Sequence, residues 1–319
     1  MVFGRLELRL LVTGASGFIG KNLLLGVPRD WEVYATYNTD RSFPRFLVDN
    51  NLEVNSIRVD LRSSRQVQHK LPRRFDACVF LASNTDTSLS VEKPVQDLDA
   101  NAKTLLNTLL ATRIHRIIYL SSGAVYDRLK DRVDPSLRLV PSLPYSISKL
   151  TAEHYVAFGR KRGLVDEYVV LRFFGAYGPF EPPHKMFTRM IDTFVFQDTA
   201  RFEIRGDGRN FIDAMYVDDA VTAIQKVLAS DVMDVTVDFA CGHPMRINEL
   251  VRRVCFILRH SPPRIVHKGH PAEYIEFLAS PKRMQELFKF RPRISLDHGI
   301  KRLAQWLTAT RRDMPPSGE

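Results

Sequence analysis

The segment LVTGASGFIG, residues 11–20, restricts the possible folds of this chain more than any other. It joins an apolar run over 8–14, which is typical of a buried strand, to a run over 17–27 with the pattern of a helix. Glycine permits a tight turn and a close backbone approach, and the first turn of a helix offers free N–H groups to a pyrophosphate. The glycines of this turn are Gly14, Gly17 and Gly20. Their spacing, G-x-x-G-x-x-G, at a strand-to-helix junction predicts a dinucleotide-binding site.

Apolar strand-like runs and helical patterns alternate along the first half of the chain. Further strands are expected over 31–37, 53–61, 75–83, 116–122 and 167–175, and further helices over 95–112 and 145–163. Apolar strands separated by helices are typical of a parallel sheet that is covered on both faces. The predicted fold class is therefore α/β, a doubly wound parallel sheet of the Rossmann type.

In the second half of the chain, strand-like and helix-like runs no longer alternate regularly. Later helices are expected over 247–260 and 296–312. We expect residues 1–174 to form the dinucleotide-binding domain, with 210–240 returning to it. Residues 175–319 are expected to form mainly a smaller, mixed α/β substrate-binding region. A second substrate would bind in the cleft between the two parts.

The chain carries a net charge of +10, from 46 lysines and arginines against 36 aspartates and glutamates. Such a charge suits either a nucleic-acid-binding protein or an enzyme that handles small anions. The basic residues are scattered, without interleaved aromatic residues or a nucleic-acid-binding motif. We therefore expect a small anionic substrate and no nucleic-acid partner.

Three cysteines at unrelated spacings give neither a disulfide framework nor a metal-binding pattern, and no metal site is expected. No apolar run reaches the roughly 18 residues that a membrane-spanning helix needs. The segment before the glycine turn is strand-like rather than signal-like. These features favour a cytoplasmic protein without a membrane partner.

Tyr145 and Lys149 stand four residues apart in the predicted helix 145–163, so their side chains share one face of it. A phenol of pKa about 10 is a poor base near neutrality, but a neighbouring ammonium favours the phenolate and would lower the pKa of Tyr145. Ser121 and Ser122 end a predicted strand, at the edge of the sheet where sites of open α/β folds form. The register with the following AVY favours Ser122 as the hydrogen-bond donor to the oxygen of a reacting carbon.

A serine at the strand end, with Tyr-x-x-x-Lys on the next helix, resembles the short-chain dehydrogenase/reductase family. The segments TGASGFIG, FLAS, SSGAVY, YSISK, LRFFGAYGP and GDGRNFIDAMYVDDA are similar, in this order, to its extended branch, the NAD-dependent epimerase/dehydratase family of nucleotide-sugar-modifying enzymes. The resemblance covers nearly the whole chain. It implies that Ser122, Tyr145 and Lys149 are catalytic, with Lys149 also binding the nicotinamide ribose. It further implies a homodimer formed through two long helices.

The expected cofactor is NAD or NADP. An acidic residue ending the second strand would favour NAD, whereas this strand runs into Asn38, and Arg41 follows. Arg41 could pair with a 2′-phosphate, which gives NADP a slight preference, and Asp60 is a candidate for binding the adenine. The expected cofactor-binding residues are Gly14, Ser16, Gly17, Phe18, Ile19, Gly20, Asn38, Arg41, Asp60, Leu61, Leu81, Ala82, Ser83, Tyr145 and Lys149.

The expected reaction is hydride transfer at a single hydroxyl or keto carbon. Family members that act as 4,6-dehydratases carry an Asp-Glu pair after the catalytic serine or threonine, where this chain has Gly123 and Ala124. The resemblance implies an NAD(P)-dependent epimerase or oxidoreductase of a sugar, a nucleotide sugar first of all. One alternative is an NADPH-dependent reductase of a 4-keto deoxysugar nucleotide or another carbonyl compound. Another is a catalytically silent dinucleotide-binding regulatory protein, which has no need of the Tyr145 proton relay.

Two departures from the family pattern concern the substrate. The family holds the substrate diphosphate with an asparagine of RFFNVYGP and an arginine of its GDG…RDF region, where this chain has Gly175 and Ile212. Lys185 and Arg209 could supply charge from nearby positions. The expected substrate-binding residues are Ser122, Gly175, Lys185 and Arg209.

Overall fold

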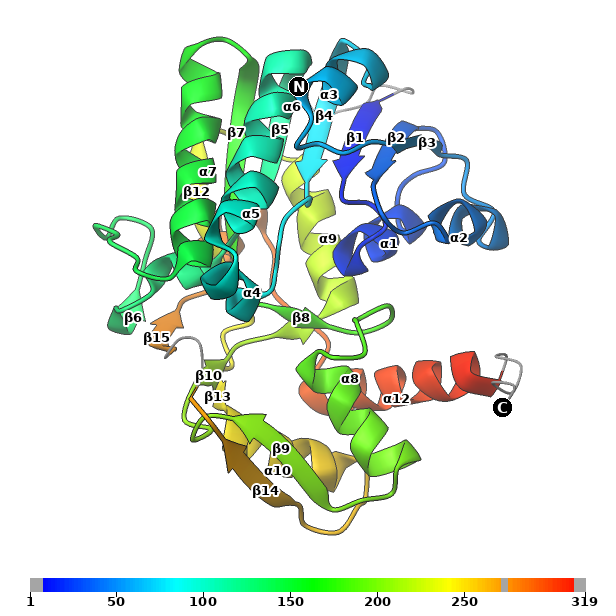
Figure 1. The fold of residues 1–319 in the computed structure, drawn as a ribbon, viewed down its shortest axis with the longest axis vertical. Coiled ribbons are helices and arrows are strands. Elements are labelled where there is room, and N and C mark those ends of the chain that lie inside the picture. Colours follow the sequence, from blue (N-terminus) through cyan, green and yellow to red (C-terminus); the bar gives the residue numbers. More distant parts are fainter. Residues whose placement is uncertain (1–7, 271–274, 313–319) are drawn as a thin grey trace.

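A computed structural model describes residues 8–270 and 275–312 of the chain (Figure 1). Its centre is a seven-stranded sheet of order β12-β7-β5-β4-β1-β2-β3, in which every neighbouring pair is parallel. The strands are β1 (Arg9–Thr13), β2 (Glu32–Tyr37), β3 (Asn55–Arg58), β4 (Arg74–Phe80), β5 (Arg113–Ser122), β7 (Val165–Phe173) and β12 (Val235–Phe239). The strand order reverses between β1 and β4, which is where open parallel sheets bind their ligands.

Helices cover both faces of this sheet, because its strands are apolar on both sides. One face packs against α1 (Phe18–Leu25), α2 (Phe43–Asp49) and α9 (Val217–Leu228), and the other against α3 (Ser64–Lys70), α6 (Thr104–Ala111) and α7 (Pro144–Lys161). Along β1, Leu10 and Val12 belong to the first core and Leu11 to the second, as the two-residue period of a strand requires. Burial of each such side chain contributes about 1.5–3 kcal/mol. The predicted doubly wound α/β fold class is confirmed.

The stretch predicted as one helix over 95–112 is divided into three parts. α5 (Pro94–Leu98) leads into a π-helical turn over Asp99–Lys103, and α6 follows. Such turns are rare and are frequently found at functional sites. Here the turn places the buried side chain of Asn101 where its amide reaches Ser148 on α7.

The apolar pattern predicts six of the seven strands and misses β12. Its sequence, VTVDF, is short and follows a long stretch without clear alternation. β12 extends the sheet because it pairs in parallel with β7, with Thr236 opposite Val170. The chain between the two strands passes through α9, which packs against α1.

The remaining elements lie mainly beyond the carboxyl ends of the strands, in the lower half of Figure 1. Met190, Val251 and Ile300 belong to a separate core there. The predicted helices over 247–260 and 296–312 correspond to α10 and α12. The helices not yet given are α4 (Thr87–Glu92), α8 (Met186–Ile191), α10 (Ile247–Ile257), α11 (Lys282–Phe288) and α12 (Leu296–Arg312), with a 3₁₀ turn over Gly123–Tyr126 and a π-turn over Asp192–Phe196.

The short strands outside the large sheet pair two by two. These pairs are β6 (Lys130–Val133) with β15 (Glu276–Ala279), β8 (Ala176–Tyr177) with β11 (Met215–Tyr216), β9 (Arg201–Arg205) with β14 (Arg264–Lys268), and β10 (Phe211–Ile212) with β13 (Met245–Arg246). Among the helices of the described residues, none combines the length and the apolarity that crossing a lipid bilayer demands.

Candidate active site

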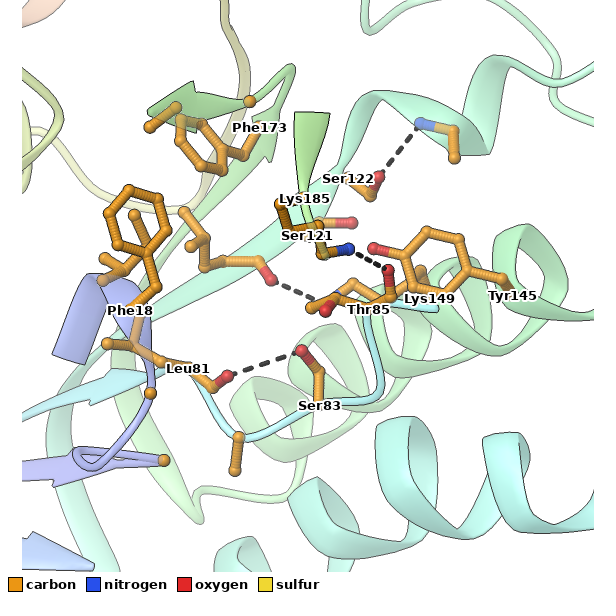
Figure 2. A pocket seen from close by; sticks show the side chains of 18 of the residues that line it. Phe18, Leu81, Ser83, Thr85, Ser121, Ser122, Tyr145, Lys149, Phe173 and Lys185 are labelled. Atoms are coloured by element: carbon orange, nitrogen blue, oxygen red, sulfur yellow. Dashed lines mark hydrogen bonds between the residues drawn. The ribbon is translucent and has the colours of Figure 1, made fainter. Parts of the chain in front are cut away.

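A cavity of about 890 Å³ lies at the carboxyl ends of the sheet strands (Figure 2). The predicted site residues that line it are Gly14, Ser16, Gly17, Phe18, Ile19, Gly20, Asn38, Asp60, Leu61, Leu81, Ala82, Ser83, Ser122, Tyr145, Lys149, Gly175 and Lys185. Two predicted residues, Arg41 and Arg209, are not among the lining residues. Arg209 is exposed and lies 3.6 Å from a carboxylate oxygen of Asp207. The fold therefore brings nearly the whole predicted set into one space.

The glycine turn after β1 lines the cavity and packs closely against the neighbouring backbone. Gly14 has a φ of +63°, and a Cβ atom there would lie 2.8 Å from the Cα atom of Ala82. A Cβ atom on Gly20 would lie 2.6 Å from the Cα atom of Ala15, so the start of α1 can pack this closely only with glycine. Gly17 caps α1 without a side-chain hydrogen bond. The first N–H groups of α1 and its dipole are therefore available to an anionic group in the cavity.

Tyr145 and Lys149 lie in the first half of α7, and both line the cavity. Pro144 begins the helix, at the position where a missing N–H costs nothing. The ammonium of Lys149 donates a hydrogen bond to the carbonyl of Leu120 at 2.7 Å and lies 4.6 Å from the centre of the Tyr119 ring. These contacts fix the lysine one helical turn from Tyr145, on the shared face that the sequence predicts.

Burial determines the protonation of Lys149. The residue is 2% exposed, and desolvation lowers the pKa of Lys149 to about 7. The carboxylates of Glu153 and Asp97 act in the opposite direction, because they stabilise the ammonium. The pKa of Lys149 therefore lies near neutrality. An anionic group bound beside Lys149 would raise this pKa, because it would stabilise the ammonium.

Ser121 and Ser122 have different partners at the end of β5. The hydroxyl of Ser121 donates a hydrogen bond to Glu153 at 2.5 Å, which occupies it in the interior between β5 and α7. The hydroxyl of Ser122 accepts a hydrogen bond from the N–H of Ala124 at 3.1 Å, which leaves its proton to be donated toward the cavity (Figure 2). Of the two serines, Ser122 is thus the one whose hydroxyl is not used by a buried carboxylate, and its catalytic role stays a prediction.

A buried polar network supports α7 from the side of the π-helical turn. The amide of Asn101 donates hydrogen bonds to Ser148 at 2.8 Å and to Asp97 at 2.9 Å, and its oxygen accepts one from the N–H of Asn84 at 2.8 Å. Ser148 donates in turn to Asp97 at 2.5 Å. None of these was predicted as a site residue. The sequence feature that could have indicated them is the four-residue spacing of Asp97 and Asn101, which places both side chains on one face of a helix.

The segments that follow β2 and β3 line one side of the cavity, and they contain the residues predicted to bind the adenosine half of a cofactor. Asp60 pairs with Arg62 at 2.8 Å, and this hydrogen-bonded arginine lowers the pKa of the Asp60 carboxyl. Asn38 lines the cavity, whereas Asp40 pairs with Lys21 at 3.1 Å and is not among the lining residues. The lining side chain at the end of β2 is therefore an amide and not a carboxylate.

Lys185 comes from the opposite side, just before α8. Its ammonium donates a hydrogen bond to the carbonyl of Thr85 at 3.1 Å, across the cavity (Figure 2). Glu181, which was not predicted, also lines the cavity and accepts hydrogen bonds from the N–H and the hydroxyl of Thr188. Burial raises the pKa of Glu181 to about 7. Within residues 8–270 and 275–312, no three His, Cys, Asp or Glu side chains are grouped closely enough to hold a metal ion.

The sequence matches known proteins over most of its length. The profile of the NAD dependent epimerase/dehydratase family matches residues 10–242. A curated relative from Methanocaldococcus jannaschii, named "Putative UDP-glucose 4-epimerase", is 27% identical over 313 residues, which cover 95% of this chain and 99% of the relative. The dTDP-D-glucose 4,6-dehydratase of Mus musculus is 22% identical over 95% of this chain and 89% of its own length.

Solved structures share the fold. The UDP-glucuronic acid 4-epimerase from Bacillus cereus, in complex with UDP-glucuronic acid and NAD, has a TM-score of 0.83 at 22% identity and covers 95% of this chain and 99% of its own. RMD from Pseudomonas aeruginosa, complexed with NADPH, has a TM-score of 0.78 at 22% identity with the same coverage. Because the family profile spans β1 to β12 and both the fold and the glycine turn agree with it, the chain belongs to the NAD-dependent epimerase/dehydratase family of extended short-chain dehydrogenases/reductases.

Proposed function

We propose that this protein is an NAD(P)-dependent epimerase or oxidoreductase that transfers a hydride at a hydroxyl or keto carbon of a sugar, with Ser122, Tyr145 and Lys149 as its catalytic residues. The observation that carries the proposal is that these side chains line one cavity together with the glycine turn. The turn suits a dinucleotide, because its glycines line the cavity and α1 begins without a side-chain cap. Residues 1–174, with 210–240, would bind the cofactor, and the rest of 175–319 the substrate.

The chain's own residues handle the proton and the reacting oxygen. A bound nicotinamide ring supplies the hydride acceptor or donor. Tyr145 takes the hydroxyl proton as the C–H bond breaks, and returns it to the oxygen when the carbonyl is reduced. Ser122 donates a hydrogen bond to the same oxygen and so fixes its position. The ammonium of Lys149 favours the phenolate of Tyr145 over the phenol.

Epimerisation and net reduction both fit this scheme, whereas 4,6-dehydration needs an additional acid. Gly123 follows Ser122, and a Cβ atom there would lie 2.9 Å from ring carbons of Phe174. An acidic side chain at this position would have to displace that ring. An epimerase keeps its cofactor through both half-reactions, while a reductase consumes NADPH, so the nucleotide that co-purifies with the protein separates the two.

NADP is slightly preferred over NAD in this proposal. Asn38 and Thr39 line the cavity after β2, while the Asp40 carboxylate is turned toward Lys21. Uncharged side chains at this place repel a 2′-phosphate less than a carboxylate would. Fluorescence titrations with NADH and NADPH measure the preference directly, and clearly tighter binding of NADH contradicts it.

Nucleotide sugars are the first substrates to test, because the names of the relatives contain UDP-glucose and dTDP-D-glucose. A carbonyl compound of another class is the alternative, and Gly175 and Ile212 favour it because neither side chain can donate a hydrogen bond to a diphosphate. The test is an assay for NAD(P)H formation or oxidation with a panel of hydroxy and keto sugars and simpler alcohols and ketones. Protein that binds NADPH but turns over no member of the panel would instead be a silent binding protein.

A homodimer is the proposed assembly. Large apolar side chains are exposed on α5, α6 and α7, namely Val95, Leu98, Leu110, Ile147 and Phe158. Ile147 and Phe158 are separated by about three helical turns and so lie on one face of α7. Exposed apolar side chains on adjacent helices could form such an interface.

A further inference from the structure

The cavity extends past the glycine turn to the carboxyl ends of β2 and β3. Asn38 and Thr39 line it after β2, and Val59, Asp60 and Arg62 line it after β3. The adenosine of a bound dinucleotide would lie here, because its ribose binds at the end of the second strand in folds of this type. The charges around this place therefore affect whether a ribose with a 2′-hydroxyl or with a 2′-phosphate binds more tightly.

Two basic side chains at this place are already paired with carboxylates. The ammonium of Lys21 lies 3.1 Å from a carboxylate oxygen of Asp40. Arg62 donates from Nε and Nη2 to the two carboxylate oxygens of Asp60, at 2.9 and 2.8 Å. Each of these cations would have to leave its carboxylate before it could bind a phosphate with its full charge.

Arg58 is a basic residue at the same place whose charge is not paired in this way. It is the last residue of β3, and in the parallel register it stands opposite Tyr37, the last residue of β2. Its Nε donates a hydrogen bond to the carbonyl of Asn38 at 3.2 Å, which holds the guanidinium beside the end of β2. In the described part of the chain no carboxylate forms an ion pair with Arg58, and its two Nη groups donate to no protein acceptor.

A second positive charge lies beside this strand end. Lys70, on α3, donates from Nζ to the carbonyl of Arg58 at 2.7 Å. Both side chains are exposed, and neither residue lines the interior of the cavity. A position at the rim suits a phosphate dianion, because an anion that stays partly hydrated avoids most of the desolvation cost of burial.

Arg41, which the sequence indicates as a partner of a 2′-phosphate, lacks this support. It is exposed and does not line the cavity, and within residues 8–270 and 275–312 no hydrogen bond holds its side chain. A phosphate that bound to Arg41 would first have to order a free side chain, whereas the guanidinium of Arg58 is already anchored.

We propose that Arg58 binds the 2′-phosphate of NADP and is the residue that makes this site prefer NADP to NAD. Its two Nη groups can donate to two phosphate oxygens, an arrangement for which arginine is well suited, while Nε keeps the Asn38 carbonyl. NAD bears no charge at this position, so Arg58 would contribute little to its binding. This inference rests on the proposed function, since it takes the cavity to be the site of a nicotinamide dinucleotide.

Fluorescence titration of the full chain with NADPH and with NADH, in the wild type and in Arg58→Met, tests the proposal without any need for turnover. We expect the affinity for NADPH to fall about tenfold or more in Arg58→Met, since charge-assisted hydrogen bonds are lost. The affinity for NADH should stay close to that of the wild type, which also shows that the variant is folded. Added salt should weaken NADPH binding more in the wild type than in Arg58→Met.

Two further variants separate Arg58 from a general effect of positive charge. Arg45→Met is the matched control, because Arg45 is exposed on α2, pairs with Asp49 and does not line the cavity. Arg41→Met tests the residue that the sequence indicates, and we expect it to keep the preference for NADPH. The proposal is overturned if Arg58→Met keeps the wild-type ratio of the two affinities, or if Arg41→Met loses the preference and Arg58→Met does not.

Failure of this inference and failure of the proposed function give different results. A wild type that binds NADH as tightly as NADPH overturns the role of Arg58 and leaves the proposed hydride transfer intact. A wild type that binds neither nucleotide contradicts the proposed function itself, and the role of Arg58 with it.

Discussion

Arg172 and Glu153 form a two-point ion pair behind the proposed catalytic residues, with Nε and Nη2 of the arginine 3.1 and 2.8 Å from the two carboxylate oxygens. Both residues are buried, at 5% and 8% exposure. Arg172 lies on β7, and Glu153 lies on α7 one turn beyond Lys149. Glu153 also accepts the hydroxyl of Ser121, the neighbour of Ser122. The ion pair therefore ties the helix that carries Lys149 to β7, and the hydrogen bond from Ser121 ties the same glutamate to β5, the strand that carries Ser122.

Glu153→Gln should destabilise the protein strongly, because it leaves the buried Arg172 guanidinium without its counter-charge. We expect a loss of about 3–5 kcal/mol in the free energy of unfolding, measured by urea denaturation. Asp49→Asn is the control, since it removes a carboxylate from the exposed Arg45–Asp49 pair and should cost no more than about 0.5 kcal/mol. Similar losses in the two variants would show that the buried pair has no special role.

Tyr145→Phe should abolish turnover while cofactor binding stays close to that of the wild type. The phenylalanine keeps the ring but has no proton to exchange, and positioned acid–base groups contribute about 10²- to 10⁴-fold to rate. Steady-state kinetics and NAD(P)H fluorescence titration give the two quantities. Tyr155→Phe, on the same helix but outside the cavity lining, is the control and should retain activity. Near-normal activity in Tyr145→Phe would remove the assignment of this tyrosine.

Lys149 should make the stability of the cofactor-free protein depend on pH. Burial lowers the pKa of Lys149 to about 7 in the folded state, whereas an unfolded lysine keeps a pKa of about 10.4. Below about pH 7 both states are protonated and the folded state bears the full cost of the buried charge. Between these two values the unfolded state binds the extra proton, so the contribution of this group to the free energy of unfolding rises with pH.

Lys149→Met removes this dependence. Relative to the variant, the wild type should gain stability on the order of 1 kcal/mol per pH unit above about pH 7. Urea denaturation of both proteins at about pH 7 and about pH 9 measures the change. A difference between the two proteins that stays constant with pH would mean that Lys149 titrates at its ordinary value.

Phe158→Asp should convert the proposed dimer into a monomer, because a charge is introduced into an apolar interface on α7. Light scattering coupled to size-exclusion chromatography gives the mass. Val48→Asp is the control, since Val48 is also apolar and is even more exposed than Phe158, but lies on α2, on the other face of the sheet. A wild-type protein that is monomeric at all accessible concentrations rules out the interface.

The position of the residues proposed to bind the cofactor could be predicted from the sequence, because the signals for them are local. The glycine turn joins consecutive elements, and its spacing is meaningful within ten residues of sequence. Tyr145 and Lys149 share one helix, so the helical period alone places them on one face. Ser122 follows from the end of one strand and the rule that sites lie at the carboxyl ends of parallel strands.

By itself, then, the sequence determined six of the seven strands of the large sheet, the glycine turn, and the position of Ser122, Tyr145 and Lys149 along one cavity, because periodicity and turn chemistry act between near neighbours. Tertiary structure decided which distant side chains meet. The Lys185–Thr85 contact joins residues 100 positions apart, and the Glu153–Arg172 pair joins a helix to a strand of the sheet. The contacts of the Phe277 ring with the rings of Phe174 and Tyr126 depend on the pairing of β15 with β6. Such contacts arise from how whole elements pack, and no local pattern encodes them.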